Sequence, residues 1–177
     1  ILSTMPYPTM VTTIIKTNVH LLLPPDPLTP LNPESPADAV SVGLLCREAF
    51  ANARAVPSPL GGGNYGLLGQ LYPAATYATL PGTAPFIMPV RPVPPVYTGT
   101  AANVVTITYN YAQQVDEYNN AHSFEAQLKT MLLKAIPHLF IAELEDRLNG
   151  FMLVTCQTIL TQMAMTYGII TANDLTK

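Results

Sequence analysis

The sequence predicts a mainly α-helical domain preceded by a long, extended, proline-rich N-terminal arm. Proline is concentrated early, because 17 of the 18 prolines fall between Pro6 and Pro95 and only Pro137 follows. Proline fixes φ and lacks an amide donor, which disfavours long helices over most of the first hundred residues. Residues 101–177 instead carry apolar side chains at three- and four-residue spacing, which is typical of amphipathic helices.

The N-terminal arm is predicted to span residues 1–36. Residues 10–23 are rich in β-branched side chains, which favours a strand or an extended segment over a helix. The prolines from Pro24 to Pro36 then impose polyproline or turn geometry. Such a segment has little core of its own. We therefore expect the arm to be ordered by lying on an adjacent subunit.

The first helix is expected from about Ala37 to Ala55. Ser35 or Asp38 can cap its N-terminus, and two prolines follow its end. Apolar side chains recur at three- and four-residue spacing and define one buried face. This face carries Val42, Leu45, Cys46, Ala49, Phe50 and Ala53.

A glycine loop and a proline-rich crossing segment complete the middle of the chain, residues 37–100. Five glycines fall within residues 61–69. They predict a backbone that needs positive φ or that closely approaches neighbouring atoms. A short helix is expected over 73–80, with proline in its first turn. Residues 83–99 then return to a proline-rich, extended segment.

Residues 101–177 are predicted to form a helical bundle. Its first helix starts near Ala101 and reaches Pro137; Asn119-Asn120 weaken its middle, and Ser123 could restart it. Its apolar stripe consists of Val104, Ile107, Tyr111, Val115, Tyr118, Phe124, Leu128, Met131, Leu132 and Ala135.

Two shorter helices are expected to follow. The first ends at Asn149-Gly150, and the second is capped by Thr155 and ends at Gly168. Residues 171–174 resemble the start of one more helix. The side chains expected to face inward are Phe140, Ile141, Leu144 and Leu148 in the first helix, and Ile159, Leu160, Met163 and Tyr167 in the second.

Composition narrows the class of protein. The 177 residues suit one compact domain with an arm and are enough to bury a core. Only 11% of the residues are charged, against about 25% in a typical protein, which suggests neutral surface buried against something. The net charge is −3, so the basic surface that nucleic-acid binding requires is absent.

The sequence carries few signals that indicate the cellular compartment. Cys46 and Cys156 form neither a disulfide scaffold nor a CxxC pair, so a reducing cytosol is expected. No apolar run is long enough to predict a transmembrane helix, and residues 21–23 run into proline and do not continue as a signal peptide. Because the chain opens at Ile1 and not at Met, we expect a processed or trimmed piece.

The candidate metal ligands and nucleophiles are isolated from one another. His20, His122 and His138 form no HxxxH pair, so a metal site would need convergence in space. Cys46 lies on an apolar helix face, where an inert, buried thiol is the usual interpretation. Cys156 lies near a helix N-terminus, which could lower its pKa, although structural packing is the simpler interpretation.

The acidic clusters and the glycine loop do not complete a catalytic pattern. Asp116-Glu117 and the acids within 143–146 fall on predicted solvent faces of helices. Gly61, Gly63 and Gly66 match the GxGxxG spacing, but no strand precedes them and no Gly-Lys-Ser/Thr ends the loop. We therefore expect no enzyme, with no catalytic, cofactor-binding or metal-binding residue and no cofactor.

The order of several segments resembles a known family. These segments are residues 47–58 (REAFANARAVPS), 60–69 (LGGGNYGLLG), 73–77 (PAATY), 80–86 (LPGTAPF), 150–155 (GFMLVT) and 166–175 (TYGIITANDL). Together they resemble the Gag polyprotein of copia-type LTR retrotransposons, in the form found in algae, diatoms and oomycetes. The resemblance covers about residues 27–177. The glycine loop of such relatives often carries histidines, where this chain has Tyr65 and Leu67.

The resemblance implies a helical, capsid-like domain that self-associates and encloses the element's RNA in a cytoplasmic virus-like particle. The implied partners are further copies of the chain, with arm exchange between neighbouring subunits, and no membrane. The CCHC zinc knuckle that such proteins use for RNA is absent, so we expect a region outside this sequence to bind the RNA. The resemblance does not decide between a closed shell and an open filament, because the form of the assembly depends on the rotation between neighbouring subunits.

Two other functions stay open on the residues alone. A domesticated Gag-like protein could act as an interaction module through proline segments such as residues 89–95, which match PxxP recognition. Packing of that segment under its own domain would dismiss this idea. An enzyme site could be assembled from distant residues, and a deep pocket lined by Cys156, His138 and a carboxylate would favour it.

Overall fold

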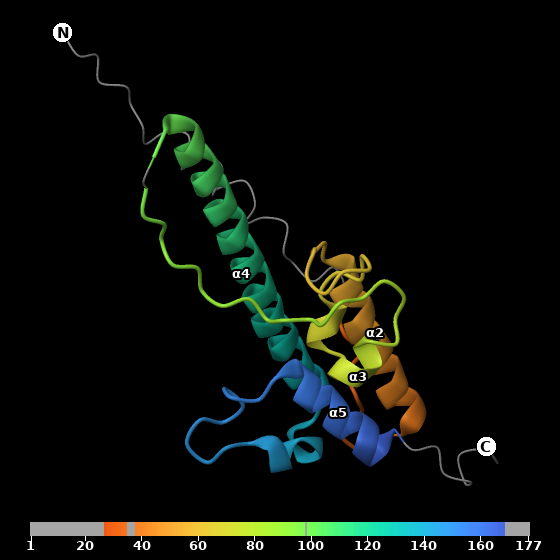
Figure 1. The fold of residues 1–177 in the computed structure, drawn as a ribbon. Helices are drawn as coiled ribbons and strands as arrows, with labels where there is room; N and C mark the ends of the chain where they lie inside the picture. Colours follow the sequence, from red (N-terminus) through yellow and green to blue (C-terminus); the bar gives the residue numbers. More distant parts are fainter. Residues whose placement is uncertain (1–26, 35–37, 98, 169–177) are drawn as a thin grey trace.

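The structure is a computed structural model that describes residues 27–34, 38–97 and 99–168, and it is mainly helical, as predicted. Strand pairing within these residues is limited to two isolated bridges. No helix in the described part is both long and apolar enough to cross a membrane. The α-helices are α2 (Ala39–Ala55), α3 (Ala74–Tyr77), α4 (Ala101–Ala135) and α5 (Cys156–Tyr167), and the short 3₁₀ helices are η2 (Leu68–Gln70), η3 (His138–Phe140) and η4 (Ala142–Leu144) (Figure 1).

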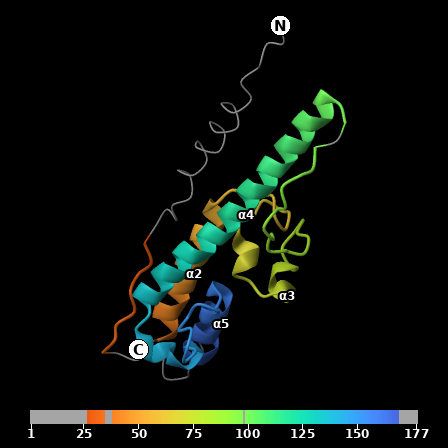
Figure 2. The same ribbon diagram turned by 90° about the vertical axis from the view of Figure 1, so that its left-hand side faces the viewer.

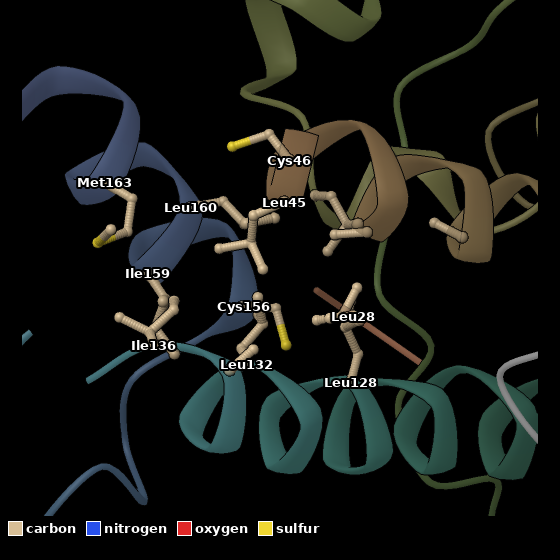
Figure 3. Close-up of a cluster of buried hydrophobic side chains, with 14 of the residues drawn as sticks. Leu28, Leu45, Cys46, Leu128, Leu132, Ile136, Cys156, Ile159, Leu160 and Met163 are labelled. Atoms are coloured by element: carbon tan, nitrogen blue, oxygen red, sulfur yellow. The ribbon is translucent and has the colours of Figure 1, made fainter. Parts of the chain in front are cut away.

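One hydrophobic core joins α2, α4 and α5. Helix α5 packs against both α2 and α4. Side chains from all three helices meet in the centre of the core (Figure 3). They include Leu45 and Cys46 from α2, Leu128 and Leu132 from α4, and Ile159, Leu160 and Met163 from α5. The segments 37–100 and 101–177 therefore bury their apolar faces against each other.

Helix α2 begins where the sequence places a capping side chain. The Asp38 carboxylate accepts a hydrogen bond from the amide of Ser41 at 2.7 Å, so the helix starts at Ala39. Ser35, the other predicted cap, lies outside the described residues. The predicted face is buried except for Phe50, which is half-buried and meets Tyr72 edge-on with ring centroids 4.7 Å apart.

Helix α4 is a single unbroken helix, so the predicted interruption at Asn119-Asn120 is wrong. Asparagine costs a helix only about 0.7 kcal/mol relative to alanine. Ala121 and Phe124 are buried immediately after this pair and hold the helix in the core. All fully buried side chains of α4 lie between Ala121 and Ala135. Residues 101–120, which we call the projecting half of α4, extend beyond the core (Figures 1 and 2).

The segment after α4 differs from the predicted short helix. It forms the two 3₁₀ turns η3 and η4, and Leu148 is 94% exposed where the sequence predicted an inward side chain. The carboxylate of Asp146 accepts hydrogen bonds from the amides of Leu148 and Asn149 at 2.9 and 2.8 Å. This local bonding competes with the helix and closes a turn that ends at Gly150, whose φ is +55°.

Helix α5 has the predicted ends. The Thr155 hydroxyl accepts a hydrogen bond from the amide of Thr158 at 3.1 Å, and Gly168 is the C-terminal cap. Ile159, Leu160 and Met163 are buried as expected, whereas Tyr167 is half-buried. The helix start predicted over residues 171–174 lies outside the described residues.

Residues 27–34 pack against their own core. Leu28 and Leu31 are buried there, and the amide of Leu31 donates a hydrogen bond to the Ala135 carbonyl at 2.8 Å. For this part of the predicted arm, the expected contact with an adjacent subunit is therefore replaced by a contact within the chain. Residues 1–26 lie outside the described residues.

Candidate functional site

The glycine loop is built by conformations and close contacts that favour glycine. Gly61, Gly62, Gly63 and Gly66 all have φ between +60° and +72°. Gly69 has an ordinary φ, but a Cβ added there would lie 2.4 Å from the Phe86 ring. All five glycines thus meet the predicted need for positive φ or close approach.

The polar groups of the glycine loop bond to the loop's own surroundings. The Tyr77 hydroxyl donates to the carbonyls of Gly61 and Gly62 at 3.3 and 3.4 Å, and the amide of Ala84 donates to the Gly61 carbonyl at 2.8 Å. The amide of Leu67 is bonded to α2. Burial raises the pKa of Tyr77, with a further contribution from Tyr65. These bonds agree with a structural loop, since a phosphate cradle needs free amides.

The two cysteines are buried and separate. Burial raises the pKa of Cys46. The sequence suggested that the helix N-terminus could lower the pKa of Cys156, and this is wrong. Burial raises the pKa of Cys156, and the nearby Glu125 carboxylate raises it further. The Cys156 amide donates a hydrogen bond to Glu125 Oε1 at 2.7 Å. The N-terminus of α5 is therefore occupied by a carboxylate from α4 and does not activate the thiol.

The histidines are held by surface contacts. His138 Nε2 lies 2.7 Å from Glu145 Oε2, and His122 Nε2 lies 3.0 Å from the Pro89 carbonyl oxygen. His20 lies outside the described residues. Within the part of the chain that the structure describes, no group of three His, Cys, Asp or Glu side chains could hold a metal ion.

The acidic residues divide between surface and packed positions. Glu143, Glu145 and Asp146 are exposed, as the sequence predicted, whereas Asp116 and Glu117 on α4 are half-buried. Hydrogen bonds from the amides of residues 149 and 148 hold the pKa of Asp146 below its usual range. These bonds shape the loop that carries the exposed Leu148.

A groove of about 650 Å³ lies between the α3 region, α4 and the chain leading into α5. We call it the aromatic groove, because Tyr72, Tyr77 and Phe86 are among the residues that line it. Met152 and Leu153, which are 68% and 71% exposed, also line it. His122, Glu125 and Lys129 of α4 also line it, but Cys156 and His138 do not. The convergence that would favour an enzyme is therefore not found in this groove.

The charged groups of the aromatic groove are engaged by the protein itself. The Lys129 ammonium donates to the carbonyls of Met152 and Phe151 at 3.2 and 3.5 Å. The Glu125 carboxylate accepts from the Cys156 amide, as described above. The groove thus offers mainly apolar walls, with one ammonium and one carboxylate that are hydrogen-bonded to the backbone.

Residues 87–97, which we call the proline ribbon, show a burial pattern that repeats every three residues. Pro89, Pro92 and Pro95 are half-buried. Val90, Val93 and Val96 are 83%, 83% and 82% exposed. Polyproline II has three residues per turn, so this pattern indicates such a helix with one proline edge and one valine edge. The ribbon follows the projecting half of α4 back to its tip (Figures 1 and 2).

The projecting half of α4 extends this uncharged surface. Val105 and Tyr109 are 69% and 61% exposed, and no side chain of residues 101–120 is fully buried. Between residues 87 and 115, Arg91 is the only charged residue. Residues 87–97 and 99–115 therefore form one long arm, which we call the neutral arm, with exposed apolar side chains and Arg91 as its one charged residue.

Neither a protein-family model, nor a curated protein, nor a solved structure matches the chain.

Proposed function

We propose that this chain is a structural, Gag-like capsid protein that assembles with copies of itself into a virus-like particle or a related homomeric assembly. The neutral arm formed by residues 87–115 is the observation that carries the proposal. Exposed apolar patches of this kind on a folded protein usually mark a protein–protein contact. The resemblance to copia-type Gag proteins favours a second copy of the chain as the partner and retrotransposon RNA as the enclosed cargo.

The composition of the projecting half of α4 supports a partner for this surface. Val, Ile, Thr, Tyr and Asn dominate residues 103–111, and all of them are weaker helix formers than alanine. Helices in proteins are stabilised mainly by packing of an apolar face and less by intrinsic propensity. A contact along its apolar side chains would stabilise this half of the helix, as burial in the core stabilises the other half.

Charge places the RNA-binding role elsewhere in the proposed assembly. The chain has a net charge of −3, and low charge reduces repulsion between copies. An acidic surface does not attract phosphate, so the RNA would be enclosed without being bound strongly by this region. In this proposal the protein is cytoplasmic and acts by assembly, not by catalysis.

Sedimentation velocity and electron microscopy of the purified chain test the proposal. We expect concentration-dependent assembly into ordered particles, which Tyr109→Asp on the neutral arm weakens. Val40→Asp is the matched control, because Val40 is also exposed, at 74%, but lies on α2. A chain that stays monomeric at every concentration would contradict self-assembly.

A deletion of residues 1–26 tests the N-terminal arm separately. We expect light scattering to show reduced particle formation if this segment lies on a neighbouring copy. The deletion spares the buried Leu28 and Leu31, so the core is retained. Undiminished particle formation would remove the arm from the proposal and leave the rest of it intact.

A second candidate function is an interaction module that presents the proline ribbon to another protein. Exposure of Val90, Val93 and Val96 favours this candidate, because the segment is not packed under its own domain. Extended proline segments dock into aromatic-lined grooves of SH3 and WW domains. Calorimetric titration of the chain with an isolated SH3 or WW domain tests this function, and absence of heat would count against it.

A further inference from the structure

We propose that the aromatic groove of one copy receives the proline ribbon of a second copy, so that copies join head to tail. This inference rests on the proposed self-assembly and specifies the contact that produces it. The two halves of the contact lie in the same chain, and the exposed valines of the ribbon are not among the residues that line its own groove.

The proline ribbon has the form of a preorganised ligand. Polyproline II rises about 3.1 Å per residue, so the exposed edges of Val90, Val93 and Val96 are about 9 Å apart. The Pro89 carbonyl is held by His122 at the start of the ribbon. A segment that is already extended and anchored loses little conformational entropy when it binds.

The aromatic groove has the form of a receptor for such a segment. Polyproline segments are recognised by grooves lined with aromatic side chains. Here the lining includes the half-buried Tyr72 and Phe86 and the exposed Met152 and Leu153. The volume of about 650 Å³ lies in the range of roughly 300–1,000 Å³ that is typical of ligand-binding pockets.

The charges of the two surfaces favour a neutral occupant. The Glu125 carboxylate and the Lys129 ammonium both line the groove, so their opposite charges offset each other and favour neither an anionic nor a cationic occupant. Arg91 is the only charged residue of the ribbon. A nucleotide or nucleic-acid segment would instead need unpaired basic groups in the groove.

The course of the chain carries the exposed valine edge of the ribbon away from its own groove. Phe86 and Met88 belong to the groove wall, and from Pro89 onward the chain follows α4 toward its tip (Figures 1 and 2). The exposed valine edge therefore remains available to a neighbour. Because the ribbon and the groove are different surfaces, each copy can give one and receive another, which produces a ring, a shell or a filament.

Complementary variants test the contact. Val93→Asp disables the ribbon and keeps the groove, whereas Leu153→Asp disables the groove and keeps the ribbon. Both side chains are more than two-thirds exposed, so folding should survive, and circular dichroism checks it. In sedimentation velocity, we expect each variant alone to stay monomeric. An equimolar mixture should form a dimer that grows no further, because only one intact contact remains in it.

A synthetic peptide of residues 87–97 tests the same contact directly. Calorimetry should detect its binding to the Val93→Asp chain, whose groove is free, and at least tenfold weaker binding to the Leu153→Asp chain. Val40→Asp, which changes neither surface, should assemble like the unaltered protein.

The outcomes separate this inference from the proposed function. If both variants assemble like the unaltered protein, docking of the ribbon is overturned while self-assembly stands. If the mixture stays monomeric, the contact pairs like surfaces and the head-to-tail arrangement is overturned. A peptide that binds an isolated WW or SH3 domain but not the Val93→Asp chain also overturns it. An unaltered chain that never assembles contradicts the proposed function itself.

Discussion

Replacement of Gly66 by alanine tests whether the glycine loop clamps the end of α2. Gly66 has φ of +60°, and a Cβ there would lie 2.4 Å from the carbonyl oxygen of Val56 and 2.7 Å from that of Ala53. Both oxygens belong to the backbone, so neither can rotate away as a flexible side chain could. The amide of Leu67, the next residue, donates to the same Ala53 carbonyl at 2.9 Å.

The expected loss of stability follows from three contributions. The left-handed conformation costs alanine about 1–2 kcal/mol. Overpacking against fixed neighbours costs about 1–3 kcal/mol. Displacement of the loop would also strain the hydrogen bond of Leu67, which is worth about 1 kcal/mol. We therefore expect Gly66→Ala to lower the free energy of unfolding by about 3–6 kcal/mol, a large part of the stability of a typical domain.

Urea unfolding followed by circular dichroism measures this loss, and Gly150→Ala is its matched control. Gly150 has φ of +55°, but a Cβ there meets nothing within 4 Å. The control should therefore lose only the conformational cost of about 1–2 kcal/mol. If Gly66→Ala is no less stable than Gly150→Ala, the loop does not clamp α2 and the structural interpretation of the glycines is refuted.

Three further predictions concern the helices and the buried thiol. Gly43→Ala, inside α2 with open space around the position, should raise the free energy of unfolding by about 1 kcal/mol in urea titrations, and an unchanged or lower value would contradict this. Glu125→Gln should lower the free energy of unfolding by about 1 kcal/mol, because it weakens the charged hydrogen bond to the start of α5. Glu117→Gln on the same helix should change this free energy little. Equal effects of the two substitutions would contradict the role of Glu125. Because the folded state raises the pKa of Cys156, its contribution to stability should be present below the unfolded pKa of about 8.5 and decrease as the pH rises above it. The unfolding midpoint of Cys156→Ala should then fall less steeply between neutral and alkaline pH, and parallel curves would count against this.

Local chemistry made the helix ends predictable from the sequence. Asp38 and Thr155 cap α2 and α5 through their own side chains, and Gly168 ends α5, so each signal lies within a few residues of its effect. The backbone constraints at the five glycines of the loop were likewise predictable, because positive φ and close contact with neighbouring atoms both favour glycine.

Two features could not be predicted from apolar spacing or from position in a helix alone. The burial of Cys156 against α4 reversed the effect that a helix N-terminus alone would have on its pKa. Leu148 matched a helical stripe, but the hydrogen bonds of Asp146 turned the chain outward there.

The candidate surfaces divide in the same way. The three-residue spacing of Val90, Val93 and Val96 is visible in the sequence and could have predicted an exposed edge of polyproline II. The aromatic groove could not be predicted from the sequence, because it is lined by Tyr72, Phe86 and Leu153, which only the fold brings together.

The length of α4 makes it a lever. About 30 Å of helix separate its first residue, Ala101, from Ala121, where burial begins, at a rise of about 1.5 Å per residue. A tilt of about 10° at the buried end would displace the tip by about 5 Å, roughly the pitch of one helical turn. Small changes of tilt near Phe124 or Leu128 would therefore become large displacements of the tip, and the curvature of an assembly would be adjusted far from the surfaces that touch.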